Sequence, residues 1–342
     1  MSCKSQKLSR VCQENLVLGR EPAMEFLQPI GAAVMVLQES IKLLPKNGKL
    51  VALTIVPTLL FSSLFFLVFN FSYKSLLRDM LMRESMLPLT SANSAEFSSI
   101  LAHLKEDFGL MLVVDLTFIL GYYIISLLSI IATILVSTIS HTERTLSSKD
   151  FALLVLRSWK RPLITGFYTT LLDIGYIFLV LFVASPVMML FSNSMEEVFF
   201  TMYLVGIAAS IVYLYLSVTW ILGIVTSVIE EDCYGIQALG KAGDLIQGMK
   251  IQGFVLNMMF ALLSVVVFQG FRIIRGHKWL VNQTIFGLFL VNVSCLLRHS
   301  QFVGYTVLYF QCKKKHGEEI ELQGEVEYTK ISSTPLADVG MP

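Results

Sequence analysis

Two charged residues lie deep inside apolar stretches of the sequence, where an ionised group is costly and is therefore a candidate for function. Asp173 follows Pro162 by 11 residues, which in a helix places it about 16 Å from that end of its span. Arg298 precedes Phe310 by 12 residues, about 18 Å from the same face of the membrane. The similar depths predict an Asp173–Arg298 ion pair, which would act as a gate or proton-coupled site, or would only lock two helices together.

Two alternatives to that pair stay open. In one, Asp173 is protonated and needs no partner. In the other, the last span ends near Leu297, so that Arg298 and His299 lie at the membrane interface. A transporter or channel would instead enclose a water-accessible cavity at mid-depth, lined by polar residues of the spans: Asp115, Asp173, Asn257, Asn292 or Arg298.

One cysteine occupies a position that suits lipidation. Cys312 stands beside Lys313-Lys314-Lys315 at a predicted membrane edge, a setting typical of S-palmitoylation and of contact with anionic lipid. An inert thiol beside a basic anchor explains the same residues. The five cysteines show no CxxC or metal-ligand spacing and none lies in a predicted outer loop, so we expect free thiols.

Catalytic and cofactor motifs are missing from the sequence. It contains no GxGxxG, Walker A, GxSxG or HExxH pattern. The acidic turn Glu230–Asp232 either binds a cationic partner or, as we expect, is a solvated approach to a helix. With His141 and Glu143 it supplies the candidate residues for a lipid-modifying enzyme. We predict a non-enzymatic protein without cofactor or metal.

The elements that position these residues are predicted to be membrane-spanning helices. The 342 residues are 55% hydrophobic and 15% charged, whereas soluble domains carry about 25% charged residues. Six stretches are long enough to cross a bilayer: Leu50–Phe71, Leu110–Ile139, Leu163–Phe191, Val198–Ile229, Ile251–Ile274 and Leu280–Phe310. The fold class is therefore all-α and polytopic. A net charge of +1 without a basic stripe predicts no nucleic-acid partner.

The distribution of Lys and Arg predicts the orientation. The inner segments would hold 18 of the 26 basic residues and the outer loops 6; the inner segments are 1–49, 140–162, 230–250 and 311–342. Both termini are thus predicted to be cytosolic. We expect disordered tails over 1–24 and 313–342 around a six-span domain over 25–312, with either Met1 or Met24 as the start.

A short amphipathic helix is predicted before each outward span. The three helices are Phe26–Leu44, Ser147–Trp159 and Gly235–Ile246. The apolar face of the first includes Ile41, and that of the third includes Ile236. Ser147 and Asp150 are spaced for a capping box.

These helices suggest a threefold repeat of interfacial helix, outward span and return span. The second and third outward spans begin alike, with Ile164-Thr165-Gly166-Phe167 and Ile251-Gln252-Gly253-Phe254. Generic placement of Lys and Arg at membrane edges is the alternative explanation. The one long outer loop, 72–109, is predicted to form two short helices that cap the outer face.

Three short motifs carry a family resemblance. They are Val228-Ile229-Glu230-Glu231 with Tyr234-Gly235-Ile236-Gln237-Ala238-Leu239, then Leu245-Ile246-Gln247-Gly248, and Thr306-Val307-Leu308-Tyr309-Phe310-Gln311-Cys312-Lys313. From Met24 onward the chain resembles an uncharacterised family of plant six-span membrane proteins, some labelled polyadenylate-binding-protein-binding proteins. It is more distantly similar to the membrane domain of bacterial glycerophosphodiester phosphodiesterases, whose catalytic domain has no counterpart here. The resemblance implies the six-span fold and no activity.

We therefore expect an integral membrane protein of the plant endomembrane system or plasma membrane. Its partners would be the lipid bilayer and other membrane or trafficking proteins, which it would organise through its interfacial helices and tails. The alternative is a small-solute transporter or channel. A dry, fully packed bundle would favour the scaffold, and a water-accessible cavity at mid-depth would favour the transporter.

Overall fold

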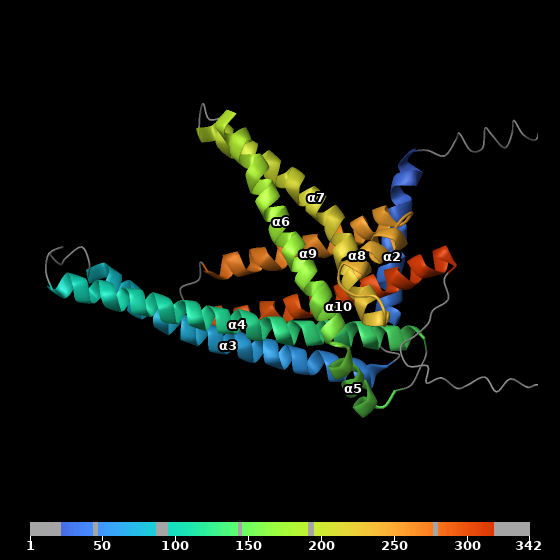
Figure 1. Cartoon of the computed structure of the whole chain (residues 1–342), viewed down its shortest axis with the longest axis horizontal. Helices are drawn as coiled ribbons and strands as arrows, with labels where there is room; N and C mark the ends of the chain where they lie inside the picture. Colours follow the sequence, from blue (N-terminus) through green and yellow to red (C-terminus); the bar gives the residue numbers. More distant parts are fainter. Residues whose placement is uncertain are drawn as a thin grey trace, which may run out of the picture.

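The computed structural model describes residues 22–43, 47–86, 95–142, 146–190, 195–275 and 280–317. The regular structure within these ranges is α-helical (Figure 1). The helices are α2 (Pro22–Leu43), α3 (Gly48–Met86), α4 (Ala95–His141), α5 (Ser148–Ser158), α6 (Lys160–Leu190), α7 (Met195–Ile229), α8 (Ile236–Leu245), α9 (Lys250–Arg275) and α10 (Leu280–His316). Most of both predicted tails lies outside the described residues.

Six of these helices are long and apolar enough to cross a membrane: α3, α4, α6, α7, α9 and α10. The prediction of an all-α protein with six spans is therefore confirmed. The 47 residues of α4 correspond to about 70 Å, whereas the hydrocarbon core of a bilayer is about 30 Å thick. Several turns of this helix consequently extend beyond the membrane.

The described helices follow one order three times: a shorter helix, then two long ones. The units are α2 with α3 and α4, α5 with α6 and α7, and α8 with α9 and α10. Within each unit the two long helices contact one another. Figure 1 shows the long helices spreading apart from one region, beside which the three shorter helices lie. This arrangement matches the order of elements that the predicted repeat requires.

The long helices converge at one end, which we call the packed end, and diverge at the opposite, open end. The buried apolar side chains lie in the first halves of α3 and α9 and in the second halves of α4, α7 and α10. The second half of α10 is at the centre, because this helix contacts α2, α3, α4, α7, α8 and α9. Tyr305 and Tyr309 of α10 are fully buried there. The packed end therefore supplies most of the tertiary stability of the bundle.

The faces of α2 and α8 that pack against the bundle match the predicted ones only in part. In α2, Ala33 and Val36 are buried, whereas Ile41 is 65% exposed. In α8, Ala238 and Ala242 are buried, whereas Ile236 is 64% exposed. The small side chains of Ala238 and Ala242 allow close approach to the bundle, and Leu245 and Ile246 at the end of the helix are buried as well.

Two further expectations need correction. Ser147 is the N-cap residue of α5, but its side chain makes no capping hydrogen bond, so the predicted capping box is not formed. The two short helices expected within 72–109 are continuous with the spans, because α3 runs to Met86 and α4 begins at Ala95. No glycine or proline separates Phe71 from Met86, so nothing in that sequence ends the helix.

Candidate functional site

A histidine with hydroxyl partners lies where α3, α4 and α10 meet. His299 of α10 is 6% exposed, and α10 continues without a break to His316. The helix therefore does not end near Leu297, and His299 lies among packed helices. His299 Nδ1 is hydrogen-bonded to Thr133 Oγ1, and Nε2 is hydrogen-bonded to Ser129 Oγ at 3.1 Å. Both partners belong to α4.

The hydrogen-bond directions assign the protons of this cluster. Thr133 Oγ1 donates its single proton to the Ser129 carbonyl at 2.7 Å, so it accepts from the Nδ1–H group of His299. A neutral imidazole has one donor and one acceptor nitrogen, and Nε2 is therefore the acceptor of the Ser129 hydroxyl. Thr58 Oγ1 of α3 lies 3.2 Å from Ser129 Oγ and 2.7 Å from the Thr54 carbonyl oxygen, which is the nearer acceptor for its one proton. The cluster is a continuous line of hydroxyls through one imidazole.

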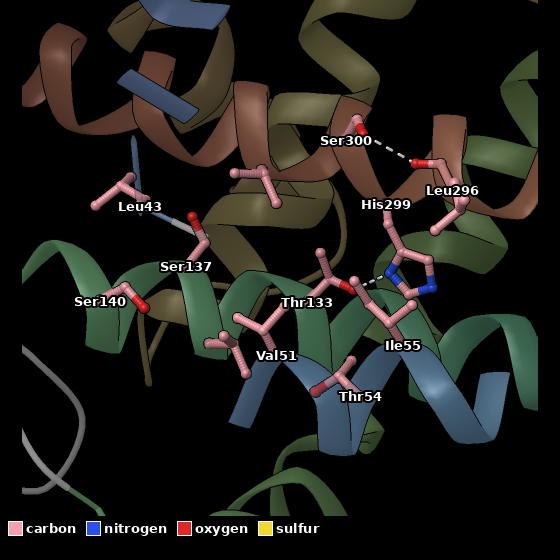
Figure 2. Close-up of a pocket in the computed structure, with 12 residues that line it drawn as sticks. Leu43, Val51, Thr54, Ile55, Thr133, Ser137, Ser140, Leu296, His299 and Ser300 are labelled. Atoms are coloured by element: carbon pink, nitrogen blue, oxygen red, sulfur yellow. Dashed lines mark hydrogen bonds between the residues drawn. The ribbon is translucent and has the colours of Figure 1, made fainter. Parts of the chain in front are cut away.

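A first cavity, cavity A, lies on the Thr133 side of this imidazole (Figure 2). Its volume is about 130 Å³. Hydroxyl groups from α3, α4 and α10 line it together with apolar side chains; the residues are Leu43, Val51, Thr54, Ile55, Thr133, Val136, Ser137, Ser140, Leu296, His299, Ser300 and Val303. Figure 2 shows His299 reaching from α10 toward α3 and α4. A polar cavity of this size holds several water molecules.

Two more cavities continue toward the open end. Cavity B, of about 30 Å³, shares Thr133 and His299 with cavity A. Cavity C, of about 670 Å³, shares Tyr122, Ser126 and Arg298 with cavity B and also contains Asp115. The three cavities therefore form a string along the α3–α4–α10 seam, and cavity B is its narrowest part.

Hydroxyl groups without protein partners lie along this string. Ser126 Oγ, beside cavities B and C, and Ser137 Oγ, beside cavity A, are buried and make no hydrogen bond with the described residues. A buried hydroxyl that lacks a partner costs about 1–3 kcal/mol. Water or a polar solute in the cavities would remove that cost.

The depth of the cluster suits a path across the membrane. Thr58 follows Gly48, the first residue of α3, by ten residues, so it lies about 15 Å along the helix from the packed end. That distance is about half of the hydrocarbon thickness of a bilayer. Arg298 and His299 were predicted candidates for this region, but the hydroxyl partners of His299 were not predicted. The sequence pattern that indicates these partners is a row of Ser and Thr residues at helical spacing on α4: Ser126, Ser129, Thr133, Ser137 and Ser140.

The structure does not bring Asp173 and Arg298 together. Asp173 of α6 lies beside Tyr213 of α7, whereas Arg298 lies beside cavities B and C on the α3–α4–α10 seam. No ion pair between them is found in the described part of the chain. Equal depth along two helices does not imply contact, because the two side chains face different neighbours.

The two asparagines of the spans link helices. Asn257 of α9 donates to Ser217 Oγ of α7 at 2.7 Å and accepts a hydrogen bond from Gln301 of α10 at 3.4 Å. Asn292 of α10 exchanges hydrogen bonds of 3.0 and 3.1 Å with Ser63 of α3. Neither asparagine is among the residues lining cavities A to C. Each amide is satisfied by polar groups of a neighbouring helix inside the bundle, which is a structural role.

The Cys312 side chain is fully buried, which counts against the predicted palmitoylation. Its Sγ atom contacts Met249 Sδ at 3.6 Å. An acyltransferase needs an accessible thiol, and this one lies within the packed end. Cys312 precedes Lys313-Lys314-Lys315 in the sequence, but the helix face that carries its side chain points inward.

Glu230 departs from the expectation of a solvated acidic turn. Its carboxylate is 13% exposed and accepts hydrogen bonds from Lys241 Nζ at 2.8 Å and Tyr309 Oη at 2.7 Å, with Lys313 Nζ at 3.7 Å. Its carbonyl oxygen accepts from Arg161 at 2.9 Å. We call these residues the Glu230 cluster. It joins α6, α7, α8 and α10, whereas the neighbouring Glu231 and Asp232 are exposed.

The residues considered for lipid-modifying chemistry have other contacts. His141 Nε2 lies 3.8 Å from Glu39 Oε1, and the His141 ring stacks on Phe310 with a centroid distance of 4.3 Å. Glu143 lies outside the described residues. No group of three or more His, Cys, Asp or Glu side chains in the described ranges is arranged to hold a metal ion.

Comparisons with known proteins place the chain in a family without assigning an activity. No curated protein and no solved structure matches the chain. A family model described as a domain of unknown function, DUF8558, matches residues 21–329. Because this match covers far more than half of the sequence, and the described helices all lie within it, the chain belongs to the DUF8558 family.

Proposed function

We propose that the protein carries a small polar solute across its membrane along the α3–α4–α10 seam. The observation that supports the proposal is the string of cavities A, B and C, in which each cavity shares polar residues with the next. A scaffold has no need of linked cavities that place polar groups at mid-depth, where every polar group must be satisfied without bulk water. A carrier does need them.

The chemistry of the seam favours an uncharged solute with hydroxyl or amide groups. Between cavities A and B the lining is neutral, with the imidazole of His299 and the hydroxyls of Ser129 and Thr133 as donors and acceptors. Two charged side chains lie toward the open end: Arg298 lines cavities B and C, and Asp115 lines cavity C alone. The cavity B volume of about 30 Å³ admits little more than a water molecule. Transport through this constriction would require α10 to move against α3 and α4.

The test is solute flux into liposomes containing the purified full-length chain. Urea, glycerol and water permeation would be measured by light scattering after an osmotic step, against protein-free liposomes. Ser126→Leu fills the junction of cavities B and C and removes a hydroxyl that has no protein partner. We expect it to lower the protein-dependent flux at least fivefold.

A matched control is available on the same helix. Thr117→Leu places the same side chain on α4 at an exposed position whose hydroxyl bonds only to the Val113 carbonyl. It should leave the flux unchanged. Protein-dependent flux that is absent for every solute, or that survives Ser126→Leu, would contradict the carrier.

A second candidate function, organisation of membrane partners, is favoured by the surface of α5. Leu153 and Leu156 of this short helix are 66% and 60% exposed although they are apolar. Such a face lies in the membrane interface or against another membrane protein. Proximity labelling from a tagged chain tests this candidate. Labelling dominated by trafficking proteins, together with absent flux, would favour the scaffold.

The same proposal includes the orientation of the protein, which rests on its charge distribution, and its location. Lys and Arg residues gather at the packed end, which we assign to the cytosol together with both termini. The resemblance to plant six-span proteins supports the endomembrane system or plasma membrane as the location. We infer that the protein acts without a cofactor or catalytic step.

A further inference from the structure

A fourth cavity, cavity D, lies between α6, α7 and α9, away from the α3–α4–α10 seam. Its volume is about 700 Å³, and it shares no residue with cavities A, B and C. The lining residues are Asp173, Tyr176, Ile177, Val180, Leu181, Ala209, Ser210, Tyr213, Leu214, Met258, Ala261, Leu262 and Val265. One carboxyl group, two phenol rings and one hydroxyl thus face an otherwise apolar space.

The carboxyl group is in the middle of the membrane. Asp173 lies near the midpoint of the span Lys160–Val187. Its carboxylate interacts with Tyr213, but Oδ1 is buried and makes no hydrogen bond with the described residues. Among the described residues that line cavity D there is no Lys, Arg or His. The described lining of cavity D therefore supplies no cation to balance an ionised Asp173 at this depth, where an isolated charge is costly.

Aromatic rings extend the site on one side of the carboxylate. The ring centroids of Tyr176 and Tyr213 lie 5.7 Å apart, and the ring centroid of Trp220 lies 5.9 Å from that of Tyr213. Tyr176 Oη donates to the Ala209 carbonyl at 2.6 Å, which fixes that ring at the cavity wall. The faces of phenol and indole rings attract cations, more strongly where water is excluded. The rings and the carboxylate therefore favour the same kind of ligand group.

The rest of the cavity selects an apolar body and an entry from the bilayer. Ile177, Leu181 and Leu262 line cavity D and are 56%, 60% and 60% exposed on the lipid-facing surface of the helices. The volume is within the range of about 300–1,000 Å³ typical of small-molecule sites. We propose that cavity D binds a lipophilic organic cation, an ammonium group carrying an apolar chain, with the ammonium against Asp173 and the chain along α6 and α9.

The ammonium group would make three kinds of contact in this site. Its charge pairs with the Asp173 carboxylate, whose Oδ1 atom otherwise lacks a partner. Its methyl or methylene groups lie on the Tyr176 and Tyr213 rings. The attached chain displaces lipid from the apolar wall. A neutral molecule of the same shape makes only the last contact and leaves the carboxylate without a counter-charge, so it binds more weakly.

The experiment compares two probes that differ only in charge. Purified full-length protein in nanodiscs would be titrated with radiolabelled hexyltrimethylammonium and with the analogue in which carbon replaces nitrogen. We expect saturable binding of the cation and at least tenfold weaker binding of the neutral analogue. Equal binding of the two probes, or no saturable binding of the cation, would overturn the proposal and leave Asp173 as a protonated residue.

Variants locate the binding site. Asp173→Asn keeps the shape and removes the charge, and it should weaken cation binding at least tenfold without changing the affinity for the neutral analogue. Asp115→Asn, in cavity C, is the matched control and should bind the cation normally. Tyr213→Leu removes a ring and keeps the carboxylate, and it should weaken cation binding several-fold. Thermal unfolding of each variant verifies its fold. Cation binding that is unchanged in a folded Asp173→Asn variant would contradict the site.

Discussion

Glu230 shows how one residue at a helix end connects several elements. Its carboxylate is the shared acceptor of Lys241, Tyr309 and the 8%-exposed Lys313. The motifs that carry the family resemblance, around Glu230 and around Tyr309, meet in this cluster. A buried lysine without its counter-charge is costly, so the contacts of Glu230 stabilise the join between α7, α8 and α10.

Glu230→Gln is expected to destabilise the packed end by about 2–3 kcal/mol, because it leaves Lys313 buried without its anion. The measurement is thermal unfolding of the purified protein in nanodiscs. Glu231→Gln is the matched control, since the adjacent carboxylate is exposed and should be neutral to stability. Equal unfolding temperatures for the two variants would contradict a stabilising role of the cluster.

Cys233 and Cys312 differ in reactivity for structural reasons. Burial raises the pKa of the Cys233 thiol, the Glu230 carboxylate raises this pKa further, and Lys241 partly opposes the rise. The thiolate fraction at neutral pH is therefore smaller than for a free cysteine. Alkylation of Cys233 should be slow at pH 7, and its rate should keep rising to a higher pH than the rate for a free thiol does. Cys312 should be alkylated only after the protein unfolds.

Mass spectrometry of single-cysteine variants, alkylated from pH 6 to 10, measures both rates. The control is a short cysteine peptide alkylated under the same conditions. Labelling of Cys312 in the folded protein, or a Cys233 profile equal to that of the peptide, would show that the packed end opens readily.

At the scale of elements, close approach of α9 to its neighbours depends on one glycine. A Cβ atom at Gly253 would lie 2.7 Å from Val218 Cγ1 of α7 and 3.5 Å from Leu308 Cδ2 of α10. The likeness between the starts of α6 and α9 pointed to this glycine, but sequence did not reveal that two helices meet there. Small residues permit such contacts between membrane helices.

Gly253→Val should therefore lower stability by about 1–3 kcal/mol through overpacking. Gly175→Val on α6 is the matched control, because nothing lies within 4 Å of a Cβ atom there. Thermal unfolding and gel-filtration profiles of the two variants provide the comparison. A Gly253→Val protein as stable as the control would mean that α7, α9 and α10 are not held in the described arrangement.

At the scale of the whole molecule, the threefold order of elements puts all turns between units at the packed end. The Glu230 cluster shows that the Glu230–Gly235 turn and the end of α10 lie on the same side, since Glu230 and Lys313 are paired. Both must therefore face the same compartment. Positive charge at this end predicts that the compartment is the cytosol.

Cysteines introduced at Asp232 and Lys314 should both be protected from an impermeant maleimide added to intact cells, and both should label after permeabilisation. A cysteine at Glu196, near the start of α7 at the open end, should label in intact cells if that end reaches the surface of the plasma membrane, and from the lumenal side in vesicles. Labelling of Asp232 and Lys314 positions from opposite sides would exclude the described fold.

The amino-acid sequence was sufficient for the class of protein and the number of spans. Apolar length determines whether a helix crosses a membrane, and this property is local to each segment. The three shorter helices were also predictable within a few residues, because periodicity and helix-breaking residues are local. Which residues of α2 and α8 turn inward was predictable only in part, since this depends on the helices that pack against them.

Only the tertiary structure decided which polar residues meet. Asp173 and Arg298 are at matched depths yet face separate cavities, while His299 meets Ser129 and Thr133 across two helices. Depth along a helix follows from residue number, whereas contact between helices depends on rotation and tilt. The rotation and tilt of each helix are determined by the packing of many side chains together, such as the small residues of α8 and Gly253 of α9. No single segment of the sequence determines them.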